Sequence, residues 1–302
     1  MSGWKKLGQV FVPQGQHPKL SSHAANPLAV RLEGDVFRVF YSGRDNKNRS
    51  SVGAVDIELP SGRVVCDHEK PFFQYGPEGS FYGEGISIGC VYQAAGIRRM
   101  LFMGWQNPPD AHWRGDIGSL VVTPDLRLDL EQDMPFLGAD RVDPISLSYP
   151  WVMKLGNQFH MWYGTTVTWD AGNCEMLHVI AHAVSDDGKT WQRQGQAIPH
   201  QLGVAQAFSR PTVAAIDGRL WMWFSYRSGS GQSYRIGAAI SENSGQSWRL
   251  ALADAGIDVS SAGWDSQMIC YPFVFWHADR LWMLYNGNGY GATGFGLAAW
   301  EG

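Results

Sequence analysis

Short apolar and aromatic runs, separated by turns that contain glycine or aspartate, recur along the whole chain. Each copy begins with a proline, continues through a first apolar run and a turn, and ends in a dense aromatic run such as residues 220–224. The prolines that begin the copies stand at positions 27, 150, 211 and 272, so the intervals are 123, 61 and 61 residues. Because the first interval is about twice the others, a further copy is expected near position 88.

That further copy is present without its proline. It runs from Ile88 through a turn at Gly96 to an aromatic run that ends in Trp105. The 302 residues therefore divide into five units of about 61 residues. Since these units account for the whole chain, we predict a single domain over residues 1–302.

Each unit has the pattern of β-strands. The runs are short and apolar on both faces, as expected of strands that lie between neighbouring sheets. Turn sequences such as Asp187-Gly188 favour hairpins, because glycine readily adopts the positive φ of tight turns. A third strand-like segment follows in each unit, at residues 51–56, 116–123, 178–185, 235–241 and 294–300. Repeated four-stranded antiparallel sheets predict an all-β fold, a five-bladed β-propeller with four-stranded blades.

The two ends of the chain complement each other. Residues 5–13, after Trp4, resemble residues 192–199, which follow Trp191 as the outer strand of a unit. The last unit stops after its third strand. We therefore predict that the N-terminal strand completes the last blade and closes the ring, which hides two sheet edges. Residues 287–291 are glycine-rich but lie between two strands, so we predict a loop there.

Composition limits the kinds of partner. The chain is 17% charged and 44% apolar, with a formal net charge of −4, which is typical of a globular protein. It has no cluster of Lys and Arg suited to nucleic acid, no membrane-length apolar run, and no signal-like apolar core near its start. We expect a neutral or polar small-molecule partner, with no nucleic acid and no membrane.

The cysteines favour a reducing compartment. Cys66, Cys90, Cys174 and Cys270 lie far apart and form no C-x-x-C pair. This spacing fits neither a disulfide framework nor a zinc site. We therefore expect free thiols, a cytoplasmic location, no metal and no cofactor.

A propeller gathers the starts of its first strands around the central axis, where ligand pockets form. The residues just before each proline-like position are therefore the candidates for a binding site. They include carboxylates, amides, an arginine and flat aromatic rings, all of which suit a sugar. The candidates for substrate contact are His23, Asn26, Arg44, Asp45, Asp143, Tyr149, Arg210, Trp264, Gln267 and Tyr271, and the candidates for catalysis are Glu84 and Asp265.

Several motifs carry a resemblance to a known family. They are Ser22-His23-x-x-x-Pro27, Tyr41-Ser42-Gly43-Arg44-Asp45, Gly79-Ser80-Phe81, and Gly263-Trp264-Asp265-Ser266 with residues 285–291. In these motifs the chain resembles, over its whole length, the five-bladed propeller glycosidases of the arabinanase/xylosidase and invertase/levansucrase superfamily. It is most similar to an uncharacterised bacterial branch associated with surface-polysaccharide clusters. The resemblance implies a glycosidase-like protein with a carbohydrate ligand.

The resemblance also locates the usual catalytic acids, and this chain departs from them. The corresponding positions here are occupied by Asn26, Tyr149, Ser209 and Gln267. Glycosidases use two carboxylates across the scissile bond. Glu84 and Asp265 remain as a non-standard acid/base pair, and the alternative is that each accepts hydrogen bonds from loop N–H groups.

Other candidates have structural alternatives as well. Arg44 and Asp45 either form a local salt bridge or contact the ligand. Arg210 can hold a carboxylate or phosphate in bidentate fashion, and it adjoins a first strand more closely than Arg227 does. His23 is either a proton donor or ligand to a sugar hydroxyl, or a hydrogen-bonded structural histidine.

Three functions fit this sequence. The leading hypothesis is a glycosidase-like enzyme that binds a sugar or glycoconjugate in the axial pocket and hydrolyses it with Glu84 and Asp265. The second is a non-catalytic sugar-binding propeller, which the non-acidic residues at the usual acid positions favour. The third is a biosynthetic-cluster enzyme of another type, a phosphorylase, transferase or tailoring enzyme, in which one acid would act with Arg210 and His23.

Overall fold

The computed structural model describes residues 3–229 and 231–302, and within them the regular secondary structure is almost entirely β-strand. The strands of the first half are β1 (Gly3–Phe11), β2 (Ser22–Arg31), β3 (Val36–Arg44), β4 (Ser50–Glu58), β5 (Arg63–Phe73), β6 (Gly85–Ala94), β7 (Ile97–Gln106), β8 (Arg114–Val122) and β9 (Leu128–Leu130). Those of the second half are β10 (Leu147–Leu155), β11 (Gln158–Thr168), β12 (Leu177–Ser185), β13 (Gln192–Gln196), β14 (Ala207–Ile216), β15 (Arg219–Arg227), β16 (Arg235–Ser241), β17 (Arg249–Leu250), β18 (Cys270–His277), β19 (Arg280–Asn286) and β20 (Phe295–Glu301).

Short helical turns occupy three connections. Two are 3-10 turns, at Pro18–Leu20 and Leu252–Ala255, and the third is the one-turn helix α1 (Asn288–Gly291). The loop predicted at residues 287–291 is therefore wrong in detail, because α1 forms there. The left-handed backbone of Gly289 and Tyr290, with φ of 65° and 58°, prevents the turn from continuing as a regular helix.

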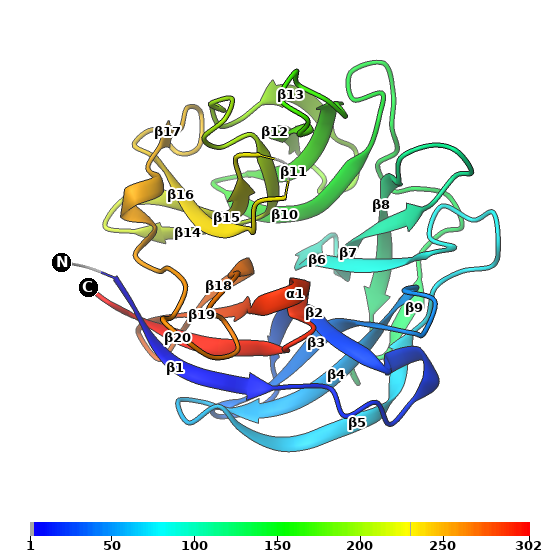
Figure 1. Cartoon of the computed structure of the whole chain (residues 1–302), viewed down its shortest axis with the longest axis vertical. Coiled ribbons are helices and arrows are strands. Elements are labelled where there is room, and N and C mark those ends of the chain that lie inside the picture. Colours follow the sequence, from blue (N-terminus) through cyan, green and yellow to red (C-terminus); the bar gives the residue numbers. More distant parts are fainter. Residues whose placement is uncertain (1–2, 230) are drawn as a thin grey trace.

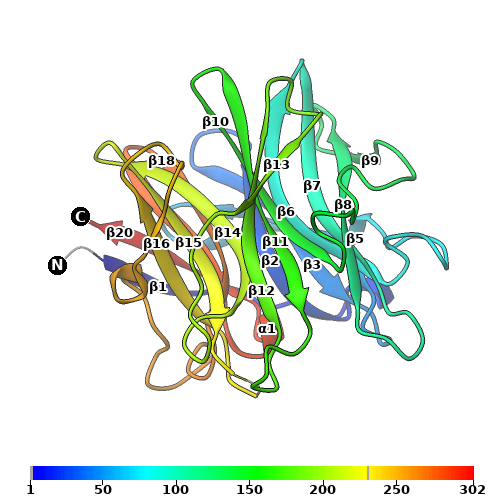
Figure 2. The ribbon, with the colours of Figure 1, turned by 90° about the horizontal axis from the view of Figure 1, so that it is seen from above.

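The strands pair antiparallel in groups of four that follow the chain (Figure 1). Strands β2 to β5 pair in order, as do β6 to β9, β10 to β13 and β14 to β17. The first strands of successive groups contact one another in a cycle, β2 with β6, β6 with β10, β10 with β14, β14 with β18, and β18 with β2. The fold is therefore all-β and propeller-like, as the repeat predicted, and Figure 2 shows the groups from the side.

The N-terminal strand joins the last group. β1 pairs antiparallel with β20, and Trp4 stands opposite Trp300. Trp4 is 7% exposed, and its ring packs edge-on against Trp223 and Trp300, with centroids 5.4 and 5.1 Å away. The predicted pairing of the N-terminal strand with the last group is confirmed, and Figure 1 shows β1 beside β20.

A bulge recurs in the strands nearest the axis. Asn26, Tyr149, Arg210 and Tyr271 each precede a proline, and each has a left-handed backbone, with φ of 54°, 37°, 49° and 54°. The strand register shifts at each of these positions. Left-handed geometry is costly for residues other than glycine, and such strain is common at functional sites.

A close contact at Gly89 explains why the second group lacks the proline. A Cβ atom at Gly89 would lie 2.5 Å from the carbonyl oxygen of Pro150 in the neighbouring group. Only glycine therefore fits where the first strands of these two groups approach each other.

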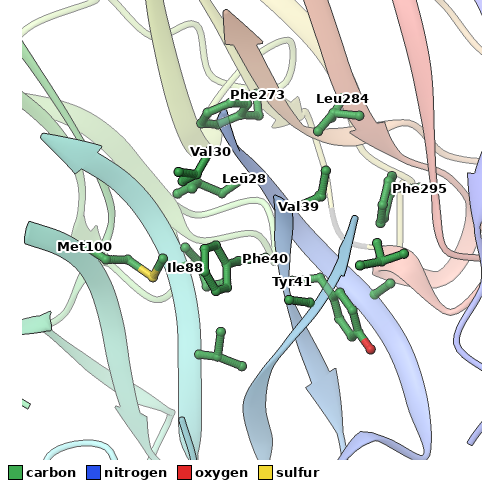
Figure 3. Packing of buried hydrophobic residues seen from close by; sticks show 14 of the residues in the cluster. Leu28, Val30, Val39, Phe40, Tyr41, Ile88, Met100, Phe273, Leu284 and Phe295 are labelled. Atoms are coloured by element: carbon green, nitrogen blue, oxygen red, sulfur yellow. The ribbon is translucent and has the colours of Figure 1, made fainter. Parts of the chain in front are cut away.

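Apolar side chains from neighbouring groups interdigitate to form the core. Leu28 and Phe40 of the first group, Ile88 of the second and Phe273 of the last belong to one buried cluster, which Figure 3 shows. Trp248 is 7% exposed and meets Trp162 of the neighbouring group edge-on. The aromatic richness of the sequence is thus explained largely by packing.

Candidate functional site

A pocket of about 310 Å³ lies where the first strands begin. Its aromatic wall consists of Trp105, Trp113, Tyr149, Phe208, Tyr234, Tyr271 and Tyr290. Its polar groups belong to Asn26, Ser42, Arg44, Ser50, Ser87, Asn107, Ser148, His178, Ser209 and Arg227. No aspartate or glutamate is among the described residues that line it. Every group of strands contributes to the wall, so the pocket lies on the axis, where the sequence predicted it.

Asn26 lines this pocket and contains a buried acceptor. The residue is 2% exposed and lines the pocket from the bulge of β2. Its backbone N–H donates to Asn286 Oδ1 at 2.8 Å, which fixes the bulge. Its own Oδ1 is buried and accepts no hydrogen bond from the described residues. A buried acceptor left without a donor costs about 1–3 kcal/mol, and a ligand hydroxyl would recover this energy.

Tyr149 and Tyr271 occupy the corresponding bulges of β10 and β18. Their hydroxyl oxygens are 3.5 Å apart and their ring centroids 5.4 Å apart. Burial raises the pKa of both phenols, so both are neutral at physiological pH. The two rings offer neutral hydroxyl groups and flat apolar faces to the pocket.

Arg44, the last residue of β3, lines the pocket next to His23. Among the described residues no carboxylate lies within 4.0 Å of its guanidinium. Burial and, to a smaller extent, the charge of Arg44 lower the pKa of His23 to about 4. His23 is therefore neutral at physiological pH, and its Nδ1 lies 3.0 Å from Ser22 Oγ. It does not line the pocket.

Arg210 occupies the bulge of β14 and lies beneath the pocket wall rather than in it. The side chain is 2% exposed, and its guanidinium donates to the carbonyl oxygens of Tyr271 and Pro27, both at 2.8 Å. Burial lowers its pKa to about 9, so it keeps its charge at neutral pH. Arg210 thus ties β18 to β2 across the axis, and its fork is already occupied.

Arg227 lines the pocket and is held by Glu175. Its Nε lies 2.8 Å from Glu175 Oε2, and its Nη2 donates to Glu175 Oε1 at 2.9 Å. Its charge is therefore compensated. Sequence reasoning missed Glu175, because this pair connects residues 52 positions apart.

Ser148 and His178 form a hydrogen-bonded pair that sequence reasoning also missed. Ser148 Oγ lies 2.7 Å from His178 Nε2, and His178 Nδ1 lies 2.8 Å from Thr166 Oγ1. Burial lowers the pKa of His178 to about 4, so the imidazole is neutral and one of its ring nitrogens can accept a hydrogen bond from the serine hydroxyl. The only sequence signal was the position of His178 at the start of a third segment, directly after the converging loops.

The two predicted catalytic carboxylates are not among the residues that line the pocket. Asp265 is 2% exposed, forms an ion pair with Lys6 at 2.7 Å, and accepts a hydrogen bond from the Tyr285 hydroxyl at 3.0 Å. Burial by itself raises the pKa of Asp265, but these hydrogen bonds outweigh it and the pKa lies below the usual value. Glu84 is half-buried beside β6, and its backbone bonds to Ser50 and Trp105, which line the pocket.

Asp45 and Asp143 are engaged with neighbouring cations. Asp45 accepts from the backbone N–H groups of Lys47 and Arg49 and forms an ion pair with Arg49 at 2.8 Å. The structure thus gives Asp45 a local salt bridge, but with Arg49 rather than with Arg44. Asp143 pairs with Arg193 and accepts from the Tyr163 hydroxyl at 2.7 Å. Neither carboxylate lines the pocket.

Trp264 and Gln267 also lie away from the pocket wall. The Trp264 ring packs on Tyr285, with centroids 5.2 Å apart. The backbone N–H of Gln267 donates to Asn288 Oδ1 at 2.8 Å. Of the residues predicted to contact substrate, the structure brings four together in the pocket, namely Asn26, Arg44, Tyr149 and Tyr271.

One cluster elsewhere has the composition of a metal site. Asp56, Cys66 and His68 place their ligand atoms within 4.8 Å of one another on the first group of strands. Arg38 donates to both carboxylate oxygens of Asp56, at 2.8 and 2.9 Å. A cation already occupies the carboxylate, so the cluster suits an ion pair better than a metal. Among the described residues, no helix is long and apolar enough to cross a membrane.

The fold is that of the glycoside-hydrolase-like propellers. A solved structure described as "Glycoside hydrolase" superposes with a TM-score of 0.74 and 13% identity, covering 99% of this chain and 91% of that one. A second, described as "The GH130 family of mannoside phosphorylases contains glycoside hydrolases that target beta-1,2 mannosidic linkages in Candida mannan", has a TM-score of 0.71 and 11% identity over 99% and 93% of the two chains. At these identities the likeness concerns the fold alone.

Two sequence relatives are much more similar. "Uncharacterized protein MT1551" and "Uncharacterized protein Rv1502", from two strains of Mycobacterium tuberculosis, are each 41% identical over 300 residues, covering 99% of this chain and 99% of theirs. No protein-family model matches the chain. The chain belongs to the same family as these mycobacterial proteins.

Proposed function

We propose that the protein binds a carbohydrate or glycoconjugate in its axial pocket. The observation that carries the proposal is the buried Oδ1 of Asn26, which lines the pocket and has no donor among the described residues. A sugar hydroxyl supplies such a donor, and the flat rings of Trp105, Tyr149 and Tyr271 suit the apolar face of a sugar ring. The propeller neighbours described as glycoside hydrolases support the same ligand class by analogy of fold.

We also propose the number of blades in the propeller and the cellular location of the protein. The cycle of contacts among β2, β6, β10, β14 and β18, together with the pairing of β1 with β20, supports a closed five-bladed propeller over residues 1–302. The four cysteines are free thiols, which suits the cytoplasmic location inferred from the sequence.

Calorimetric titration with common monosaccharides and their disaccharides tests the proposal. At least one sugar should bind the wild-type protein, and Asn26→Ala should weaken its binding by about 3- to 10-fold, the value of one hydrogen bond. Asn157→Ala is the matched control, because Asn157 is exposed in the turn between β10 and β11. Equal affinities of the wild type and Asn26→Ala would contradict the role of this amide, and a complete lack of binding would contradict the function.

Hydrolysis by Glu84 and Asp265 stays a prediction. Neither carboxylate lines the pocket, and Lys6 holds Asp265 in its ionised form, which suits a general acid poorly. Binding without hydrolysis is therefore the function that the geometry supports best. Unchanged release of reducing sugar by Glu84→Gln and Asp265→Asn would reject the pair.

Catalysis of another kind is a second candidate, and the Ser148–His178 pair favours it. The neutral imidazole lies 2.7 Å from the serine hydroxyl, and both residues line the pocket. Such a pair can act as a general base on a bound ligand in a transfer or hydrolysis reaction. If the protein turns over a glycoside or sugar ester, His178→Gln should reduce kcat by 100-fold or more, and an unchanged kcat would reject this candidate.

A further inference from the structure

The buried carboxylates of this protein follow one rule. Among the described residues, each has an arginine or lysine as an ion-pair partner. The pairs are Asp45–Arg49, Asp56–Arg38, Asp116–Arg114, Asp143–Arg193, Glu175–Arg227 and Asp265–Lys6. Compensation of this kind is expected, because an isolated charge is expensive to remove from water.

The converse does not hold for arginines, because two arginines at the axis have no carboxylate partner among the described residues. Arg210 is 2% exposed, and its guanidinium has carbonyl oxygens as acceptors but no carboxylate within 4.0 Å among the described residues. Arg44 is half-buried in the pocket wall and forms no ion pair or side-chain hydrogen bond with the described residues. Arg227, on the same wall, has Glu175. The axis therefore holds two uncompensated positive charges.

The groups around Arg44 do not neutralise it. Asp45, the next residue, is turned into its own loop and pairs with Arg49. His23 is neutral at physiological pH, and Tyr149, whose phenol is also neutral, lies in the same pocket. The described lining residues include Arg44 and Arg227 but no carboxylate, although the whole chain has a net charge of −4.

We propose that Arg44 binds an oxyanion group, a phosphate or carboxylate, that lies beside the sugar in the axial pocket. This inference rests on the proposed carbohydrate function and narrows it to a negatively charged sugar, or to a neutral sugar bound together with free phosphate. Of the three axial arginines, Arg44 is the one whose guanidinium has no acceptor among the described residues, because carbonyl oxygens accept from Arg210 and Glu175 accepts from Arg227. A guanidinium matches the two oxygens of a phosphate or carboxylate in bidentate geometry.

Each half of such a ligand has its own contacts. The oxyanion meets Arg44, with the hydroxyl group of Ser42, two residues earlier on β3, in the same wall. The sugar hydroxyls meet Asn26, and the ring faces meet the aromatic wall. Arg210, beneath the wall, adds positive charge without direct contact. Affinity for the charged and neutral parts should therefore respond to different substitutions.

Calorimetric titration with matched ligands tests the inference. The probes are glucose, mannose and galactose, their 6-phosphates, their uronic acids, and inorganic phosphate with and without each neutral sugar. The wild type should bind at least one phosphorylated or uronic sugar 10-fold or more tightly than its neutral parent. Arg44→Gln should remove most of this difference while the affinity for the neutral parent stays within about 3-fold.

The control removes the same charge elsewhere. Arg219 is exposed and pairs with Glu242 on the surface, so Arg219→Gln tests the long-range effect of lost charge alone. It should leave the preference for the anionic sugar unchanged. Circular dichroism and unfolding by urea should show that Arg44→Gln remains folded.

The outcomes separate the inference from the function on which it rests. Preference for a 6-phosphate or a uronic acid assigns the oxyanion to the sugar, and mutual enhancement of binding between phosphate and a neutral sugar assigns it to free phosphate. Equal binding of neutral and anionic sugars without mutual enhancement by phosphate, or an equal loss for both in Arg44→Gln, overturns the oxyanion site and leaves the carbohydrate function standing. If none of the sugars binds, the carbohydrate function fails, and the inference fails with it.

Discussion

Buried charges are paired in one region of this protein and unpaired in another. Away from the axial pocket, a buried carboxylate such as Asp143 or Asp265 forms an ion pair with a cation from a distant part of the chain, Arg193 or Lys6. At the axis, Arg44 and Arg210 have no such counter-charge among the described residues. The contrast indicates that the paired charges serve the fold, whereas the uncompensated charge of Arg44 is available to a ligand.

The largest effect is expected from breaking a structural pair. Asp143→Asn removes the buried carboxylate partner of Arg193, whose side chain is 8% exposed, and leaves only the more exposed Asp140, whose Oδ2 lies 3.2 Å from Arg193 Nε. Breaking this buried pair should lower the free energy of unfolding by about 3 kcal/mol, measured with urea, because Asp140 compensates the charge only in part. Asp258→Asn is the control, since Asp258 is 75% exposed beside Arg235, and it should change stability by less than about 0.5 kcal/mol. Similar losses in the two variants would erase the contrast between buried and exposed pairs.

Lowering the pH should destabilise the protein through His178, the neutral histidine of the pocket. Burial lowers the pKa of His178 to about 4, whereas the unfolded chain takes up that proton near the ordinary value of about 6.5. The free energy of unfolding should therefore fall as the pH decreases from about 6.5 to 4, by roughly 3 kcal/mol from this residue. His178→Gln should lose that part of the slope. The same slope in both proteins would mean that His178 is not held neutral.

The pH range in which His178 affects stability can be separated from the range in which the carboxylates do. Hydrogen bonds outweigh the effect of burial at Asp265 and hold its pKa below the ordinary carboxyl range. Its contribution is therefore present at higher pH and disappears as the pH falls below about 4 and through the lowered value. Urea unfolding at pH 7, 5 and 4 consequently reports mainly on the histidines.

A smaller effect is expected from Arg210. Arg210→Met removes an uncompensated charge but leaves the carbonyl oxygens of Tyr271 and Pro27 without their donor. These opposing effects should give a loss of about 1–2 kcal/mol in the free energy of unfolding. A loss as large as that of Asp143→Asn would indicate that Arg210 has a hidden ionic role in the fold.

The smallest effect on stability is expected from Arg44. Its guanidinium forms no ion pair with the described residues, so Arg44→Gln should change the free energy of unfolding by less than about 0.5 kcal/mol. Urea unfolding of the ligand-free protein measures this directly. A loss above about 2 kcal/mol would make Arg44 a structural residue and remove the contrast on which the proposed oxyanion site depends.

The repeat could be predicted from the sequence because it consists of local patterns of residues. Proline spacing located the first strands, and the resemblance of the segments after Trp4 and Trp191 predicted the pairing of β1 with β20. The missing proline of the second unit was detected from spacing, but its reason required Pro150 of the next group.

The site was only partly predictable, because its chemistry depends on pairs between distant segments. Asn26, Arg44, Tyr149 and Tyr271 could be predicted to line the pocket because they lie beside the axial strands in the sequence. It did not indicate that Lys6, 259 residues away in sequence, engages Asp265, or that Glu175 engages Arg227. Which guanidinium groups already have acceptors could be seen only in three dimensions, and this distinguishes Arg44 from Arg210 and Arg227.

The central claim is that the axial pocket binds a sugar with its hydroxyl groups at Asn26 and an oxyanion at Arg44. The most direct measurement is a crystal structure of the protein with the tightest-binding probe from the sugar phosphate and uronic acid series. The account predicts ligand density with a phosphate or carboxylate within hydrogen-bond distance of the Arg44 guanidinium and a sugar hydroxyl at the Asn26 amide. Density outside the axial pocket, or with the oxyanion directed away from Arg44, would contradict it.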